Sequence, residues 1–274
     1  MSLVQLILNP KKIDASIKKN NIIEINMSKG VIHVKIIDVH AHILPGLDDG
    51  SSDEEKSMEM IKMAESQGIT TIIATPHYSH YFQSSRQNVL AVYEKLMAYI
   101  KSEGHCTIQI YTGQEILYSE DVPDKLAAGE LMTLADSRYV LIEFLPFDSY
   151  SKIFRAAGMV AMAGYRMILA HAERYECLRN PDKMQELLEA GVKIQMNYRP
   201  VGGKWYNDTT RWCRKMLKEG NIHFLGTDMH NMDSRKPDIK SAVHWMTKHL
   251  DEEYMQDICY RNAEQVLNDK QIKR

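Results

Sequence analysis

The feature that most constrains the fold is an alternation of short β-branched segments with longer amphipathic ones, which starts near residue 31. Seven segments have the composition of strands, and they are residues 31–39, 70–75, 107–113, 139–144, 167–170, 192–197 and 222–227. Repeated strand, helix, strand units favour parallel strands joined by right-handed crossovers. The chain is therefore predicted to be an α/β protein, built as a closed barrel or as a doubly wound sheet.

Two segments between the strands have clear helix signals. Residues 89–100 carry apolar side chains at helical spacing, and Gly104 follows as a stop. Residues 53–67 behave likewise, with Ser51 or Ser52 as the candidate N-cap. No glycine-rich phosphate loop of the GxGxxG or Walker type occurs, which disfavours a nucleotide-binding doubly wound sheet.

Length and charge define the class of protein further. The chain has 274 residues, of which 44% are hydrophobic, so it can bury the core of one large domain. Residues 31–274 are predicted to form that domain, and residues 1–30 an N-terminal extension of uncertain structure. Lys and Arg number 34 against 36 Asp and Glu, with no run of one sign, so a nucleic-acid partner is not expected.

Cysteine usage and the N-terminus bear on the cellular compartment. The cysteines are widely spaced and form no CxxC pair, which favours the reducing cytoplasm. Neither a signal peptide nor a membrane-inserted segment is expected. The sequence does not predict an oligomeric state.

Side chains that can bind metals lie at the C-terminal ends of the predicted strands or in the loop after the first. In a parallel barrel these ends open on one face, where the loops form a shared pocket. The nine candidates are His40, His42, Asp49, His77, Glu115, Glu143, His171, Asp228 and His230. One ion usually takes three or four protein ligands, so nine N and O donors predict two or three divalent ions. The other six histidines are predicted to be structural or solvent-facing, and they are His33, His80, His105, His223, His244 and His249.

Clustered divalent ions predict a reaction. They lower the pKa of a bound water and bind anionic oxygens, so phosphate-ester hydrolysis by a metal-activated hydroxide is expected. Arg174 and Arg235 follow the fifth and seventh strands, where either could grip phosphate oxygens or form a surface salt bridge.

Several neighbouring polar residues have weaker assignments. Asp38 is a candidate to orient an imidazole or to cap the strand end, and Asp48 to shape the turn. Three residues after the sixth strand could line the pocket wall or form an ordinary turn, and they are Asn197, Tyr198 and Arg199.

The segments DVHAHILPGLDDG, ATPH, GQE, LIEF, HAERY and TDMHN together resemble a known family. In this order they are similar to the metal-dependent bacterial protein tyrosine phosphatases encoded in capsule and exopolysaccharide operons, within the polymerase and histidinol phosphatase superfamily. The resemblance runs from about residue 36 to residue 267. Two features depart from it: the segment before residue 36 is longer, and the loop MNYRPVGGKWY differs.

The resemblance implies a distorted seven-stranded β/α barrel with three ions per chain, often manganese, with iron, zinc or magnesium as alternatives. It implies three ligand sets: His40, His42, Glu115 and Asp228; Glu115, Glu143 and His171; and Asp49, His77 and His230. Arg174 and Arg235 match positions associated with substrate phosphate. The implied substrate is the tyrosine-rich tail of an autophosphorylating bacterial tyrosine kinase that regulates polysaccharide synthesis.

Alternative functions remain open at this point. A phosphatase of small metabolites such as histidinol phosphate would use the same barrel, and a non-catalytic regulator would use metals only to hold its shape. An amidohydrolase also opens with HxH, but three carboxylates and no strand-end Lys argue against it. A cysteine nucleophile is not supported, because no Arg lies six residues after Cys106, Cys177, Cys213 or Cys259.

Overall fold

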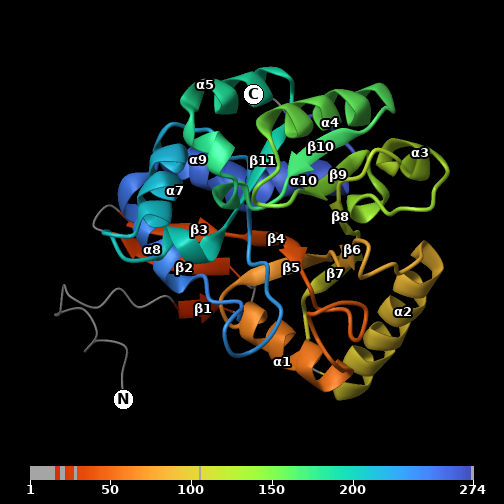
Figure 1. Ribbon diagram of the computed structural model, residues 1–274. Coiled ribbons are helices and arrows are strands. Elements are labelled where there is room, and N and C mark those ends of the chain that lie inside the picture. Colours follow the sequence, from red (N-terminus) through yellow and green to blue (C-terminus); the bar gives the residue numbers. More distant parts are fainter. Residues whose placement is uncertain (1–15, 19–21, 28–29, 105, 273–274) are drawn as a thin grey trace, which may run out of the picture.

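The computed structural model describes residues 16–18, 22–27, 30–104 and 106–272, with side chains described from residue 35. The strands are β1 Ser16–Lys18, β2 Ile22–Met27, β3 Gly30–Val34, β4 Ile36–Ala41, β5 Ile69–Ala74, β6 His77–Tyr78, β7 Gln109–Thr112, β8 Glu115–Leu117, β9 Tyr139–Glu143, β10 Arg166–Leu169, β11 Lys193–Asn197 and β12 Phe224–Gly226. The α-helices are α1 Glu54–Glu65, α2 Arg86–Glu103, α3 Val122–Ala127, α4 Tyr150–Met162, α5 Pro181–Glu189, α6 Tyr198–Val201, α7 Asp208–Lys218, α8 Lys240–His249, α9 Glu252–Gln256 and α10 Asn262–Leu267. Helices surround the strands, as Figure 1 shows.

The strands from β4 onward form two parallel sheets. One has three strands in the order β4-β5-β7, and the other has six in the order β12-β11-β10-β9-β8-β6. The sheets follow one another because β5 leads into β6 and β7 leads into β8. At the far end, the Asp228 N–H donates to the His40 carbonyl at 2.8 Å, so the segment after β12 lies against β4. The result is a curled parallel sheet whose C-terminal strand ends face a common centre.

This arrangement confirms the α/β fold with a curled parallel sheet, but the described strands number six plus three rather than the seven predicted. The second and third predicted strands each continue, after a break, into a further short strand. The breaks fall at Thr75–Pro76 and Gly113–Gln114. Gly113 permits a close approach at the second break, because a Cβ there would lie 2.7 Å from Leu134 Cδ2.

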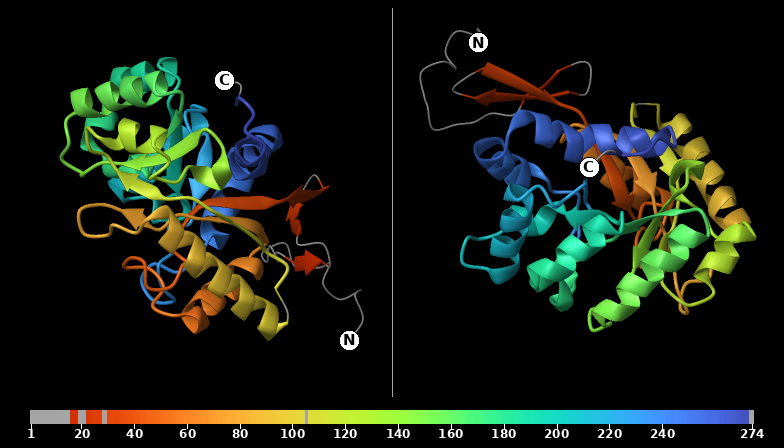
Figure 2. Two further views of the ribbon diagram at one scale, coloured as in Figure 1. Left: turned by 90° about the vertical axis from the view of Figure 1, so that its right-hand side faces the viewer. Right: turned by 90° about the horizontal axis from the view of Figure 1, so that it is seen from above.

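The first predicted strand, residues 31–39, was wrong as a single element. It divides at Lys35 into β3 and β4. β3 pairs antiparallel with β2, and β2 with β1, in a separate sheet that projects beside the body of the molecule (Figure 2). The predicted domain boundary at residue 30 therefore falls within β3.

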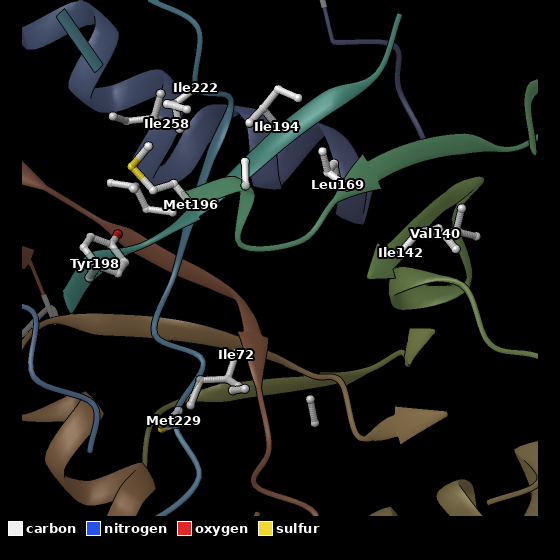
Figure 3. Packing of buried hydrophobic residues seen from close by; sticks show 14 of the residues in the cluster. Ile72, Val140, Ile142, Leu169, Ile194, Met196, Tyr198, Ile222, Met229 and Ile258 are labelled. Carbon is white, nitrogen blue, oxygen red and sulfur yellow. The ribbon is translucent and has the colours of Figure 1, made fainter. Parts of the chain in front are cut away.

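The core lies between the parallel strands and the helices. Strands buried on both faces need apolar side chains on both, and every residue of β4 is buried. Figure 3 shows Ile142, Leu169, Ile194 and Met196 from successive strands packed in one cluster. Burial of each such side chain stabilises the fold by about 2 kcal/mol relative to exposure. This core fixes the strand ends that carry the polar residues described next.

The helix predictions were close to the structure. α2 ends at Gly104, which has a left-handed backbone as its C-cap. α1 begins one residue later than the serines suggested, because Asp53 rather than Ser51 or Ser52 accepts the cap hydrogen bond from the Lys56 N–H. No helix in the described part of the chain is long and apolar enough to cross a membrane.

Candidate metal centre

The nine predicted ligands come together at the C-terminal ends of the parallel strands. Six of them are almost fully buried, although all are polar or charged: His40, His42, Glu115, His171, Asp228 and His230. His77 and Glu143 are partly buried, and Asp49 is about half exposed. Polar groups are rarely buried at this density without strong partners.

Four of these residues form the tightest group. Glu115 Oε2 lies 3.0 Å from His40 Nε2 and 3.2 Å from His42 Nε2, and the two imidazole nitrogens are 3.1 Å apart. Asp228 Oδ1 lies 3.5 and 3.4 Å from the same two nitrogens. One donor atom from each residue lies within 4.8 Å of the others. The first ligand set implied by the sequence is therefore brought together.

A second group extends from Glu115 toward β9. His77 Nδ1 lies 3.1 Å from Glu115 Oε2 and 3.1 Å from Glu143 Oε1, and these three residues could hold one ion. His171 Nε2 lies 2.7 Å from Glu115 Oε1 and 3.5 Å from Glu143 Oε2. The structure thus places His77 as well as His171 beside the two glutamates.

A third group surrounds the loop after β4. His42, His77 and His230 form a possible three-nitrogen site. Asp49 Oδ1 lies 3.5 Å from His77 Nε2 and 3.5 Å from His230 Nε2. The implied set of Asp49, His77 and His230 is therefore adjacent, and His42 joins it.

Unsatisfied buried atoms test whether these residues fit metal ions. Glu115 Oε2 and His230 Nε2 are buried and form no well-aligned hydrogen bond in the described part of the chain, although Glu115 Oε2 lies 3.0 Å from His40 Nε2 and His230 Nε2 lies 3.5 Å from Asp49 Oδ1. Imidazole nitrogens and carboxylate oxygens that converge on a point are the ligands of borderline and hard divalent ions. The donor set therefore fits divalent cations.

Charges within the centre compensate one another. Burial alone would raise the pKa of Glu115, but His40, His77 and His171 hold it well below its usual range. Burial alone would lower the pKa of His171, whereas its hydrogen bond to Glu115 raises it to about 9. Protons on the imidazoles thus balance the negative charge of the carboxylates. Bound divalent ions would replace those protons as the source of positive charge.

Asp48 has a larger role than the turn-shaping predicted for it. Its Oδ1 accepts from the Gly50 N–H, as a turn residue would, while Oδ2 accepts from His42 Nδ1 at 2.7 Å and from the His77 N–H at 2.8 Å. A carboxylate on the far ring nitrogen of a ligating histidine fixes the tautomer and the ring direction. In the sequence, the only sign of this role was that Asp48 lies next to the candidate ligand Asp49.

Gln195 was not singled out from the sequence. Its Oε1 accepts from the His171 N–H at 2.6 Å and faces His40 Nδ1 at 3.3 Å. Its Nε2 donates to Asn197, whose amide donates in turn to Asp228 Oδ2 at 2.9 Å. The shared inward face of Gln195 and Asn197 on β11 was the only local signal. Asn197 therefore lies at the pocket wall, as predicted, where it donates a hydrogen bond to Asp228.

The predictions for Asp38 and Tyr198 need correction. The Asp38 carboxylate reaches no imidazole; it accepts from the Thr227 N–H, the Thr227 hydroxyl and the His40 N–H, and so joins β4 to β12. Burial raises its pKa to about 6. Tyr198 is buried in the core, whereas Arg199 lies exposed beside the pocket.

Two candidate ligands have left-handed backbones. His171 has φ 33° and Asp228 has φ 53°, a region that is uncommon for residues other than Gly, although Asp and His enter it more often than most. Such a conformation persists only where the surrounding structure enforces it, and it concentrates at functional sites.

The two predicted arginines lie at the edge of the centre. Both contact the same carboxylate: Arg174 Nη2 pairs with Asp228 Oδ2, and Arg235 Nη2 lies 2.7 Å from Asp228 Oδ1. Arg235 Nη1 also lies 3.6 Å from Asp49. Both guanidinium groups are partly exposed, so an anion from solvent can reach them.

Fold and site together define an α/β protein with a curled parallel sheet and a cluster of candidate metal ligands at the strand ends. Residues 36–268 match the family model described as capsular polysaccharide synthesis, CpsB/CapC. The chain belongs to this family.

Curated relatives cover most of the chain. It is 30% identical over 244 residues to the tyrosine-protein phosphatase CpsB of Streptococcus pneumoniae, which spans 86% of this chain and 100% of the relative. It is 31% identical over 242 residues to the tyrosine-protein phosphatase YwqE of Bacillus subtilis (strain 168), and this match covers 87% of this chain and 94% of the relative.

Solved structures agree in fold. The chain is similar, with a TM-score of 0.80 and 30% identity, to one determined for YwqE from Bacillus subtilis and CpsB from Streptococcus pneumoniae, described as metal-dependent tyrosine phosphatases; 87% of this chain and 97% of that one are covered. The phosphotriesterase homology protein of Escherichia coli matches with a TM-score of 0.54 and 11% identity, over 85% and 99% of the two chains, and shares the fold alone.

Proposed function

We propose that this chain is a metal-dependent protein tyrosine phosphatase. The observation that carries the proposal is the convergence of buried imidazoles and carboxylates, with Glu115 Oε2 and His230 Nε2 unsatisfied, beside two accessible arginines. Family membership supports the same activity, since the curated relatives are named tyrosine-protein phosphatases.

The proposed ligands are the nine residues of the candidate metal centre, and the proposed number of ions is three, with manganese as the native metal. Three overlapping donor groups support the number. Bound divalent ions would supply an activated water and Lewis-acid contacts to phosphoryl oxygens. Glu115 belongs to two of the three groups, which supports a bridging role for its carboxylate.

The chain's own residues would bind and orient the substrate. Arg174 and Arg235 each present a guanidinium that can hold two oxygens of a phosphate, once that anion competes with Asp228 for them. Asp48 and Gln195 would hold His42 and His40 in register with Glu115. The phenolate leaving group, whose conjugate acid has a pKa of about 10, needs little help from a general acid.

Finer parts of the proposal concern architecture and setting. The two parallel sheets would act as one seven-position barrel, with β5 and β6, and β7 and β8, as interrupted strands. Residues 31–274 would form the phosphatase domain after an N-terminal extension. The protein would act in the cytoplasm. Its substrate would be the tyrosine-rich tail of an autophosphorylating tyrosine kinase that regulates capsule or exopolysaccharide synthesis, in keeping with the family description.

A metal-dependence assay on a phosphotyrosine peptide tests the activity. Hydrolysis should disappear with chelator and return with added manganese, while His42→Ala should abolish turnover and leave the circular dichroism spectrum unchanged. Much faster cleavage of histidinol phosphate than of phosphotyrosine would overturn the substrate assignment. A folded, metal-loaded protein inert to every phosphoester would overturn the enzyme itself in favour of a regulator.

A further inference from the structure

A groove of about 780 Å³ adjoins the candidate metal centre. Its walls come mainly from the segments that follow β10, β11 and β12. Arg174, Asp228 and Arg235 line one part of it, so the groove is continuous with the proposed phosphate site. We call it the cationic groove, after Arg174, Arg199, Lys204, Arg235 and Lys236.

The charge of the groove is unbalanced. Six cationic side chains line it against three carboxylates. Asp228 is already paired with two arginines, and Glu173 is buried with only 7% exposure. Arg199, Lys204 and Lys236 are exposed, and none of them forms an ion pair within the described residues. An acidic ligand would therefore meet positive charge that the protein does not itself neutralise.

The loop that carries Lys204 is held in place. Arg214 Nε donates to the Val201 carbonyl at 3.0 Å, and its Nη2 donates to the Gly203 carbonyl at 2.9 Å. A Cβ on Gly202 would lie 2.8 Å from Ser241 Cβ, so this loop packs tightly on α8. A positioned loop loses less conformational entropy on binding than a mobile one.

Aromatic rings accompany the charges. Trp205 is 75% exposed and Tyr206 58% exposed, with ring centroids 5.9 Å apart. Lys204 Nζ lies 5.8 Å from the centre of the Tyr206 ring. Exposed aromatic side chains offer apolar contact area beside the cations, a composition typical of protein-binding surfaces.

We propose that the cationic groove binds acidic residues next to the phosphotyrosine of a protein substrate, and so selects acidic phosphotyrosine segments. This inference rests on the proposed phosphatase activity. The groove begins at the arginines assigned to the phosphate, so a peptide chain anchored there would place its neighbouring residues along Arg199, Lys204 and Lys236. Electrostatic selection of this kind acts mainly on association and on specificity.

The test compares two phosphotyrosine peptides of equal length, one with Asp and Glu flanking the phosphotyrosine and one with Gln and Ser. The proteins are the wild type, the double variant K204E/K236E and the control K101E, which reverses an exposed lysine on α2. For the wild type, kcat/KM should be higher for the acidic peptide. In the double variant it should fall roughly tenfold for that peptide alone, chiefly through KM. Both variants should cleave p-nitrophenyl phosphate at the wild-type rate.

Binding gives a readout independent of turnover. Fluorescence anisotropy with the same peptides carrying a non-hydrolysable phosphonate should show tighter binding of the acidic peptide, weakened by salt and by K204E/K236E but not by K101E.

Different results would overturn the groove proposal and the phosphatase proposal. If the wild type cleaves both peptides with equal kcat/KM, or if both variants lose the same fraction of kcat/KM, the proposed role of the groove is overturned and the phosphatase activity is not. If the metal-loaded wild type cleaves neither of the peptides and does not cleave p-nitrophenyl phosphate, the groove proposal and the phosphatase proposal are both overturned. A single-stranded oligonucleotide that displaces the acidic peptide at lower concentration than the peptide itself would also overturn the assignment, in favour of a nucleic-acid surface.

Discussion

Single residues behind the candidate ligands hold those ligands in position. Asp48 accepts hydrogen bonds from the His42 ring and the His77 backbone, so one carboxylate positions two histidines. Asp48→Asn would turn an amide N–H toward one of these donors. We expect metal affinity to fall about 10- to 100-fold with the fold retained.

Titration of activity against manganese measures this effect. Asp53→Asn is the matched control, because it changes the neighbouring helix cap and not the centre. Wild-type metal affinity in Asp48→Asn would show that the hydrogen bond does not orient His42.

His223 lies outside the candidate centre and gives a pH-dependent prediction. Burial and the nearby Lys193 lower its pKa to about 3, and its Nδ1 accepts from the Ile194 N–H. The folded state thus binds the proton more weakly than the unfolded state, whose pKa is about 6.5. Its contribution is present above pH 6.5 and is lost as the pH falls toward 3.

His223→Asn removes this titration. The stability difference between wild type and variant should shrink, by up to about 2 kcal/mol, between pH 7 and pH 5. Urea unfolding at both pH values measures it. A difference that stays constant would exclude protonation of His223 as a source of acid sensitivity.

The residue types at the centre were predictable because metal ions restrict ligands to a few side chains and parallel strands gather their C-terminal ends. The positioning residues were not. Gln195 acts on His171 and His40 only because β11 lies beside β10, and Asp38 reaches Thr227 only because β12 closes against β4. Contacts across that many residues leave no local pattern.

At the scale of elements, β12 packs closely against β4 and β11 at Gly226. A Cβ on Gly226 would lie 2.7 Å from His40 Cβ and 2.8 Å from Gln195 Nε2. Gly226→Ala should therefore push β12 from β4, destabilise the fold by about 1–3 kcal/mol and displace a candidate ligand.

Denaturant unfolding and a metal titration test this together. Gly158 in α4 is the matched control, since a Cβ there meets nothing within 4 Å. Gly158→Ala should stabilise the protein by about 0.5–1 kcal/mol. Equal stability of the two variants would show that β12 can move without cost.

Helices were easier to predict than strands for a physical reason. The α2 pattern repeats over 18 residues and ends at a glycine with a left-handed backbone, so the signal is local. The segment 31–39 is rich in β-branched residues along its whole length, yet it contributes strands to two sheets. Nothing in a short apolar run shows which partner strand it will meet, and only the pairing of β3 with β2 separates it from β4.

At the scale of the whole molecule, the alternation of strands and helices in the sequence predicted the parallel sheet but not the number of its strands. Whether β5 and β6 hydrogen-bond as one strand or two depends on how the sheet twists at Thr75–Pro76. Twist and closure come from all the strands together. The candidate metal centre lies where these strand ends meet, so ions bound there should act on the stability of the entire domain.

Removal of metal should therefore lower thermal stability as well as activity. Ligands of the centre come from the ends of strands between β4 and β12, and an ion that binds only the folded state stabilises it by about 3 kcal/mol at 100 times its dissociation constant. For a chain of this size, that corresponds to a Tm higher by roughly 5–10 °C. Differential scanning fluorimetry with chelator, with manganese and with potassium chloride at equal ionic strength measures the shift. Among the carboxylates, Glu115→Gln should reduce it most, because Glu115 is the carboxylate that belongs to two of the three donor groups. A Tm that chelator leaves unchanged while activity disappears would contradict this prediction, because ions that bind only the folded state must stabilise it.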